Sequence, residues 1–247
     1  MKKNYIMLNL NLNFYKPSKW IERNTKDIEN FVLKYDPDFI TFQEFGSNST
    51  NYDASGRQLE ETLLEEGYSF VKSIDGKNAV NTRIFYKNNL AQLLKMLPAF
   101  YEDGFLNRQC GALFKVNNKN VAIYSVHLPL YESVYKKNGK TILINNGFEK
   151  KAMWENIIKF SKKDSDEIDF KILAGDYNEY NLGEKSTLSE KLDILEQYLD
   201  PVITEEPTWN KQKLDHIFVS KNLVHGKSEP IKNTVSDHKA LMLKFEI

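Results

Sequence analysis

Apolar and polar residues alternate at the start of the chain, where residues 6–14 set leucines and a methionine between asparagines. A period of two predicts a β-strand with its Asn side chains on one face. Similar alternation, or a short apolar run, predicts strands at 39–42, 68–74, 83–86, 112–116, 121–128, 170–174, 214–220 and 240–246.

Helical spacing of apolar residues predicts helices at 20–34, 58–66 and 148–160. The first should end before Pro37, and Gly67 is a plausible C-cap of the second. Residues 187–190 form a capping-box pattern, which predicts a fourth helix running towards Tyr198. Strands and helices mix without strict alternation, which favours packed sheets flanked by helices over a parallel barrel.

The chain is 247 residues long, and no repeat or Pro/Gly/Ser-rich linker divides it. We therefore expect a single domain over residues 1–247. Thirty-four basic residues balance thirty-four acidic ones, which excludes a uniformly basic nucleic-acid coat. With one cysteine, Cys110, the chain has neither an internal disulfide framework nor a multi-cysteine zinc site.

The zero net charge is a sum of opposite local charges. Residues 132–163 hold eight lysines and three glutamates, a net charge of about +5. Residues 164–206 hold thirteen acids and three lysines, a net charge of about −10. This pattern fits solvated helix faces, and it also fits a basic region beside an acidic region that attracts cations.

No uninterrupted apolar run of about 18 residues occurs, so we expect no membrane span. Asparagines interrupt the stretch near the N-terminus that would have to serve as a signal peptide. We therefore expect a cytoplasmic protein, and a monomer.

Several chemically capable side chains stand at or near the ends of apolar strands. Glu44 follows a buried run, His127 ends another, and Asp176 and Asn178 follow a third. Asp215 lies inside an apolar strand that begins at Leu214, and Asp237 and His238 precede the last strand. A His beside an acid, with a second acid to orient it, is a general-base arrangement. Each signal is weak by itself, because a strand-end acid or His is more often structural.

The order of these segments resembles the endonuclease/exonuclease/phosphatase superfamily of metal-dependent phosphoesterases. The resemblance covers nearly the whole chain, from Asn11 to His238. Six segments carry it in the family's order: Leu10-Asn11-Leu12-Asn13, Phe42-Gln43-Glu44, Val126-His127-Leu128, Gly175-Asp176-Tyr177-Asn178, Leu214-Asp215-His216-Ile217-Phe218-Val219 and Ser236-Asp237-His238. It implies an α/β (α+β) four-layer sandwich, in which two packed mixed β-sheets are flanked by helices.

The resemblance also implies a role for each residue. Glu44 resembles the principal metal ligand, with Asn11 and Asp237 beside it, although Asn9 or Asn13 could replace Asn11 if the register slips by two. Asp176 resembles the acid that orients or deprotonates the attacking water.

Three further roles concern the phosphate. His238, oriented by Asp215, resembles the base or transition-state contact, and Asn178 resembles a donor to phosphate oxygens. His127 resembles a His that contacts the phosphate or protonates the leaving oxygen. No carboxylate near residues 81–86 offers the support that deoxyribonuclease-like members give this His. Oxygen ligands of this kind suit Mg²⁺ or Mn²⁺.

The resemblance defines the chemistry better than the substrate. A phosphodiesterase acting on nucleic acid, most simply a DNA nuclease, is the first interpretation. Residues 136–163, which hold many lysines with Tyr131, Tyr135 and Trp154 nearby or among them, would follow a phosphate backbone. The alternatives are a phosphatase, a phospholipase- or sphingomyelinase-type phosphodiesterase acting on inositol phosphates or lipid head groups, and a non-catalytic binding protein.

Overall fold

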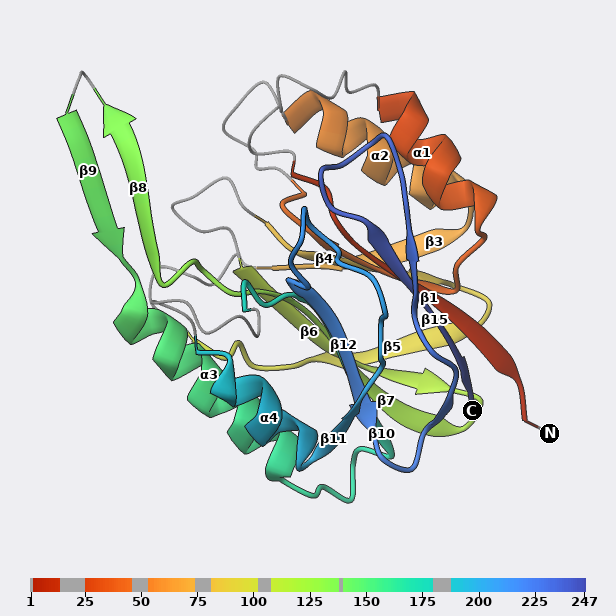
Figure 1. Ribbon diagram of the computed structural model, residues 1–247. Coiled ribbons are helices and arrows are strands. Elements are labelled where there is room, and N and C mark those ends of the chain that lie inside the picture. The colour runs from red at the N-terminus through yellow and green to blue at the C-terminus, as the bar shows by residue number, and fades with distance from the viewer. Residues whose placement is uncertain are drawn as a thin grey trace.

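The computed structural model describes residues 2–13, 25–45, 53–73, 81–101, 108–137, 140–179 and 188–247. Within these residues the chain forms two large mixed sheets, one separate hairpin and four helices (Figure 1). The helices are α1 (Thr25–Lys34), α2 (Asp53–Glu65), α3 (Gly147–Lys162) and α4 (Glu190–Glu196).

The first sheet has β1 near its centre. Its order is β13 (Val224–His225), β15 (Ala240–Glu246), β1 (Asn4–Asn11), β2 (Phe39–Gln43), β4 (Arg83–Lys87) and β3 (Tyr68–Lys72), with β14 (Glu229–Ile231) paired to β15. Only β1 and β2 pair in parallel, and the other pairs are antiparallel.

The second sheet has β7 and β10 at its centre, and these two strands are parallel. Its order is β11 (Leu199–Pro201), β12 (Asp215–Ser220), β10 (Phe170–Asp176), β7 (Lys119–His127), β6 (Gln109–Val116) and β5 (Ala91–Met96). The two remaining strands, β8 (Glu132–Lys137) and β9 (Lys140–Asn145), pair with each other as a hairpin.

Three apolar clusters hold the layers together. Met7, Ile123 and Leu243 belong to the cluster between the two sheets. A second cluster joins α1 and α2 to the first sheet, and a third joins α3 and α4 to the second. Figure 1 shows these helix pairs on the two outer sides of the sheets. The expected four-layer sandwich of two packed mixed sheets flanked by helices is confirmed.

The first strand shows how the sequence pattern produces these layers. In β1, Tyr5 and Met7 lie in the cluster between the sheets, whereas Leu8 and Leu10 lie in the cluster under α1 and α2. Successive side chains of a strand point to opposite faces, so β1 is buried on both faces. Asn9 and Asn11, which alternate with the leucines, therefore lie on the face towards the second sheet.

Most expected elements form, with shifted ends. The helix expected at 20–34 is described from Thr25, and its first residues lie outside the described part of the chain. Gly67 has a φ of +85° and closes α2 as expected. The helix expected towards Tyr198 forms as α4, which begins at Glu190 after Ser189, whose side chain makes no capping hydrogen bond. Thr187, the first residue of the expected capping box, lies outside the described residues.

Candidate active site

The polar strand ends gather at one edge of the paired sheets. Asn11 and Gln43 are register partners at the carboxyl ends of the parallel strands β1 and β2. In the other sheet, Asp176 is the register partner of both His127 on β7 and Asp215 on β12. The carboxyl ends of parallel strands meet at the same edge of a sheet, so both sheets contribute to one site.

A short loop before β15 brings His238 to this edge. The Ser236 hydroxyl donates a hydrogen bond of 2.5 Å to the backbone oxygen of Asn11. The Asn233 side chain accepts from the backbone N–H groups of Val235 and Ser236, and its amide donates to the His238 oxygen at 2.8 Å. The loop is thus folded on Asn233 and fixed to the end of β1 by Ser236.

His238 and Asp215 form a buried hydrogen-bonded pair. Nδ1 of His238 lies 2.8 Å from Oδ2 of Asp215. Burial opposes the charged form of His238, but the Asp215 carboxylate outweighs it and raises the pKa of His238 to about 10. The Thr208 hydroxyl accepts hydrogen bonds from the backbone N–H groups of Leu214 and Asp215, which fixes the start of β12.

Asp176 is held from two sides. Its Oδ2 accepts a hydrogen bond of 3.0 Å from Nδ2 of Asn11, and its Oδ1 accepts one of 2.8 Å from the backbone N–H of Asn178. Burial, followed by the negative charge of Asp215, raises the pKa of Asp176 to about 7. Asp176 is therefore able to hold or release a proton near neutral pH.

Glu44 lies on the opposite sheet and faces the same centre. It has a φ of +50°, which is uncommon for a residue with a Cβ, and it directly follows β2. Burial raises the pKa of Glu44, against the opposing effects of Arg108 and His238 and a hydrogen bond from the Asn11 side chain. The Asn11 amide therefore links two carboxylates that belong to different sheets.

The three asparagines of the first strand and its end differ in their partners. Asn9 lies deeper between the sheets, where its Oδ1 accepts from Thr41 and Gln43. Asn13 uses its backbone N–H to bond the Oδ1 of Asn11 at 2.8 Å. Asn11 donates its side-chain amide to Asp176, which favours Asn11 for the position at the candidate metal site.

His127 is buried beside both carboxylates, in surroundings that favour its neutral form. Its Nε2 lies 3.6 Å from Glu44 Oε1 and 3.7 Å from Asp176 Oδ2. Burial, together with the positive charge of Arg108, lowers the pKa of His127 well below the ordinary 6.5. These contacts therefore join a neutral imidazole to two acids, and they are not ion pairs.

Arg108 is a site residue that the sequence reasoning missed. Its Nη1 lies 3.4 Å from both ring nitrogens of His127. It directly precedes β6, and no periodic pattern distinguishes it from a surface arginine. A guanidinium at this position supplies positive charge that suits a phosphate oxygen.

Asn178 and Asp237 lie at the rim. The Asn178 amide donates to the backbone oxygen of Leu128 at 2.8 Å, so at least one of its two donors serves the loop. Asp237 is exposed, and its Oδ2 accepts a hydrogen bond of 3.2 Å from the Trp209 indole. Trp209, also missed from the sequence, has its ring 6.3 Å from that of His238.

The residues present fit a divalent cation. Asp176 and Asp215 bring carboxylate oxygens within 4.8 Å of each other and of the His238 ring, and Glu44 faces the same group. The buried Oδ1 of Asp215 has no hydrogen-bond partner among the described residues. Clustered buried carboxylates are costly unless a cation or proton neutralises them, and oxygen donors suit Mg²⁺ or Mn²⁺.

Lys150 and Trp154 of the basic segment 136–163 are buried, although we expected this segment to form a surface. Lys150 is buried and pairs with Glu179 at 2.8 Å, and it also donates to the backbone oxygen of Asn178. Trp154 is fully buried and donates its indole N–H to Glu179. The expectation that these two residues follow a phosphate backbone is therefore wrong, because both are buried and bond to Asn178 or Glu179.

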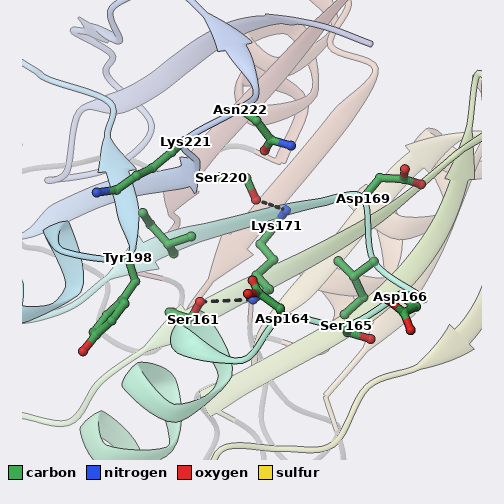
Figure 2. A pocket seen from close by; sticks show the side chains of 12 residues that line it. Ser161, Asp164, Ser165, Asp166, Asp169, Lys171, Tyr198, Ser220, Lys221 and Asn222 are labelled. Atoms are coloured by element: carbon green, nitrogen blue, oxygen red, sulfur yellow. Dashed lines mark hydrogen bonds between the residues drawn. The ribbon is translucent and has the colours of Figure 1, made fainter.

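A separate hollow of about 370 Å³ opens at the other end of β10 (Figure 2). Lys171 lies in it and donates to the backbone oxygens of Phe160, Ser161 and Lys163 at the end of α3. Lys171 precedes Asp176 by five residues, roughly 16 Å along a strand. The hollow is therefore not part of the sheet edge where Asp176 and the other polar strand ends gather.

Among the described residues, no helix is long and apolar enough to cross a membrane.

Comparisons with known proteins agree with this arrangement. The model of the endonuclease/exonuclease/phosphatase family matches residues 8–238. No curated protein matches the chain.

Solved structures of similar fold include enzymes of different specificity. D. rerio TDP2, complexed with a single-strand DNA product, has a TM-score of 0.72 at 16% identity and covers 98% of each chain. ANGEL2, a 2',3'-cyclic phosphatase, has a TM-score of 0.69 at 14% identity, covering 99% of this chain and 95% of its own. A Bacteroides thetaiotaomicron mannosyl-6-phosphatase has a TM-score of 0.66 at 15% identity, with coverages of 98% and 99%.

Proposed function

Because the chain belongs to the endonuclease/exonuclease/phosphatase family, we propose that it is a divalent-metal-dependent phosphodiesterase acting on nucleic acid, most simply DNA. The observation that carries the proposal is the convergence of two sheets on one centre. Asn11 and Glu44 come from one sheet, and Asp176 and Asp215 come from the other, with His238 hydrogen-bonded to Asp215.

Glu44, Asn11 and Asp237 would hold Mg²⁺ or Mn²⁺ in this proposal. A bound cation neutralises charge that develops on phosphate oxygens and on the leaving group. Carboxylates alone would repel a phosphodiester, so we expect the cation to be needed for substrate binding as well as for chemistry.

Two residues act on the attacking water and the phosphate. Asp176, whose pKa is raised to about 7, is suited to orient the water and accept its proton. His238 is charged at neutral pH because of Asp215, so it donates a hydrogen bond to a phosphate oxygen as negative charge grows there. In this role His238 is a transition-state contact and not a base.

His127 and Asn178 complete the proposed phosphate site. Neutral His127 retains one ring N–H, which is available for a hydrogen bond to a phosphate or leaving-group oxygen. The second amide hydrogen of Asn178 is available for the same purpose, because the other bonds Leu128. Arg108 adds a positive charge beside His127.

A substrate panel tests the proposal. Purified protein with Mg²⁺ or Mn²⁺ is incubated with supercoiled plasmid, single-stranded DNA, RNA, inositol phosphates and sphingomyelin, with His238→Ala as the control. We expect cleavage of nucleic acid that falls at least about 100-fold in the variant. Absence of turnover on every ester, or equal turnover by both proteins, would contradict the proposal and favour a non-catalytic binding protein.

A phosphatase, or a phosphodiesterase acting on lipid head groups, is the second candidate. The burial of Lys150 and Trp154 removes two residues from the surface proposed to follow a nucleic acid, which favours a small head group. Two of the similar folds, ANGEL2 and the mannosyl-6-phosphatase, are phosphatases by their names. Release of phosphate or head group without cleavage of plasmid, RNA or single strands would select this candidate.

A further inference from the structure

The hairpin of β8 and β9 stands apart from the rest of the fold. Its strands pair with each other over six register positions, from Glu132 with Asn145 to Lys137 with Lys140. Neither strand belongs to the two large sheets, and Figure 1 shows the hairpin projecting away from them. A two-stranded ribbon with no sheet beneath it leaves its faces open to a partner.

The hairpin and its two ends concentrate exposed apolar side chains. Ten large hydrophobic residues are exposed in the described part of the chain, and five of them lie within residues 130–148. These five are Leu130, Val134, Leu143, Ile144 and Phe148. Val134 and Leu143 are register partners, so they share one face of the ribbon at 64% and 60% exposure.

The last register positions of the same ribbon carry three lysines. Lys136 is paired with Thr141 and Lys137 with Lys140, whereas Glu132 stands at the first position. Aliphatic side chains beside a cluster of lysines are the composition of elements that lie at a membrane interface. A polybasic cluster is attracted to anionic lipid head groups, while the apolar residues enter the boundary with the acyl chains.

The base of the hairpin is fixed beside the catalytic edge. The hairpin begins five residues after His127, and the backbone N–H of Asn146 donates to the Tyr131 oxygen at 2.8 Å. The ring of Tyr131 packs where a Cβ on Gly147 would stand. A surface bound by the hairpin is therefore held next to the site.

We propose that the β8–β9 hairpin binds the surface of a bilayer that contains anionic phospholipid. Charge complementarity favours this occupant, and the exposed aliphatic side chains favour it over nucleic acid, because a phosphate backbone offers them no apolar surface. The proposal concerns an interaction surface and stands independently of which ester the site hydrolyses. It requires no membrane-spanning segment.

Vesicle binding tests the proposal without turnover. The full chain is sedimented with vesicles of phosphatidylglycerol and phosphatidylcholine, or of phosphatidylcholine alone. We expect binding to the anionic vesicles that weakens as salt rises. Val134→Asp should weaken it about tenfold, and Lys140→Gln about fivefold. Val224→Asp is the matched control, since Val224 is a strand residue exposed to 50% elsewhere, and it should leave binding unchanged.

Other results would overturn the proposal. The first is that the Val134→Asp and Val224→Asp variants bind vesicles equally, and the second is that the parent protein binds no vesicles. The third is that Val134→Asp weakens binding to DNA and not to vesicles. The fourth is that the protein self-associates in ultracentrifugation and Val134→Asp abolishes this association. Hydrolysis of bis(4-nitrophenyl) phosphate by the Val134→Asp variant is measured in parallel. Because binding is read without a reaction, failure of this proposal and failure of the proposed function are distinguishable.

Discussion

The Nδ1 atom of His238 lies 2.8 Å from Oδ2 of Asp215, although the two residues belong to strands of different sheets or to the loops before them. Asp215 opens β12 in the second sheet, and His238 stands just before β15 of the first. The hydrogen bond therefore joins the two sheets at the edge that holds the candidate site.

Replacing Asp215 by Asn should lower the pKa of His238. The neutral amide of Asn cannot offset the effect of burial, which lowers the pKa of His238 by opposing its charged form. We expect turnover to fall by about 100-fold or more, because His238 is no longer held in the charged form. NMR titration of the His238 ring in metal-free protein measures the pKa directly, and an unchanged pKa would contradict the assignment.

The same pair makes stability depend on pH. The pKa of folded His238 lies above its ordinary value, so the charged form stabilises the fold. This stabilisation is fully present below about pH 6.5 and is lost as the pH rises through about 10. Urea unfolding should show that His238→Gln costs about 3 kcal/mol at pH 6 and less at pH 10. An equal cost at both values would exclude a charged pair.

Affinity for Mg²⁺ should increase with pH. A cation binds most tightly when its ligand Glu44 and the neighbouring Asp176 are both deprotonated, and burial raises the pKa of both carboxyls, that of Asp176 to about 7. One proton with that pKa makes the affinity about tenfold weaker at pH 6 than at pH 8. Calorimetry in two buffers of different ionisation enthalpy measures the proton release, which should vanish above pH 9.

Removal of Glu44 should abolish stabilisation by metal. A ligand that binds only the folded state at 100 times its Kd adds about 2.7 kcal/mol to the free energy of unfolding. We expect Mg²⁺ to raise the Tm of the parent protein and leave that of Glu44→Gln unchanged, while Glu66→Gln, an exposed control, behaves as the parent does. Chelation by EDTA should reverse the rise.

The buried ion pair below the site should be essential for stability. Lys150→Met leaves the buried carboxylate of Glu179 without its cation, which costs about 3–5 kcal/mol. Lys151→Met changes an exposed neighbour and should cost less than about 1 kcal/mol. Adding Glu179→Gln to Lys150→Met should recover part of the loss, and the absence of any recovery in urea unfolding would show that packing alone is responsible.

Long periodic elements were predictable from the sequence, and several short ones were not. β1, β2, β10 and β15 carry apolar runs or alternation that survives in the fold. β5 was missed because Ala91–Met96 contains no β-branched residue and is partly exposed. The β8–β9 hairpin was also missed, although the dipeptide Asn138-Gly139 is a hairpin signal, because the preceding residues 132–137 are mostly polar.

The candidate site was predictable only where residues end or begin strands. Glu44, His127, Asp176 and Asp215 occupy such positions, so their order in the chain was informative. Arg108 and Trp209 reach the site from loops, and the burial of Lys150 depends on how α3 packs on the second sheet. Tertiary contacts of this kind leave no periodic trace in a sequence.

The hydrogen bond from Ser236 to the backbone of Asn11 has a consequence for protein synthesis. The two residues are separated by 225 positions, and β1 pairs with the late strand β15. A chain emerging from the ribosome therefore carries Asn11, Glu44 and Asp176 before His238 exists. Whatever ester the site hydrolyses, a nascent chain cannot assemble the full constellation until the segment from Ser236 to His238 has been synthesised and bound to the end of β1.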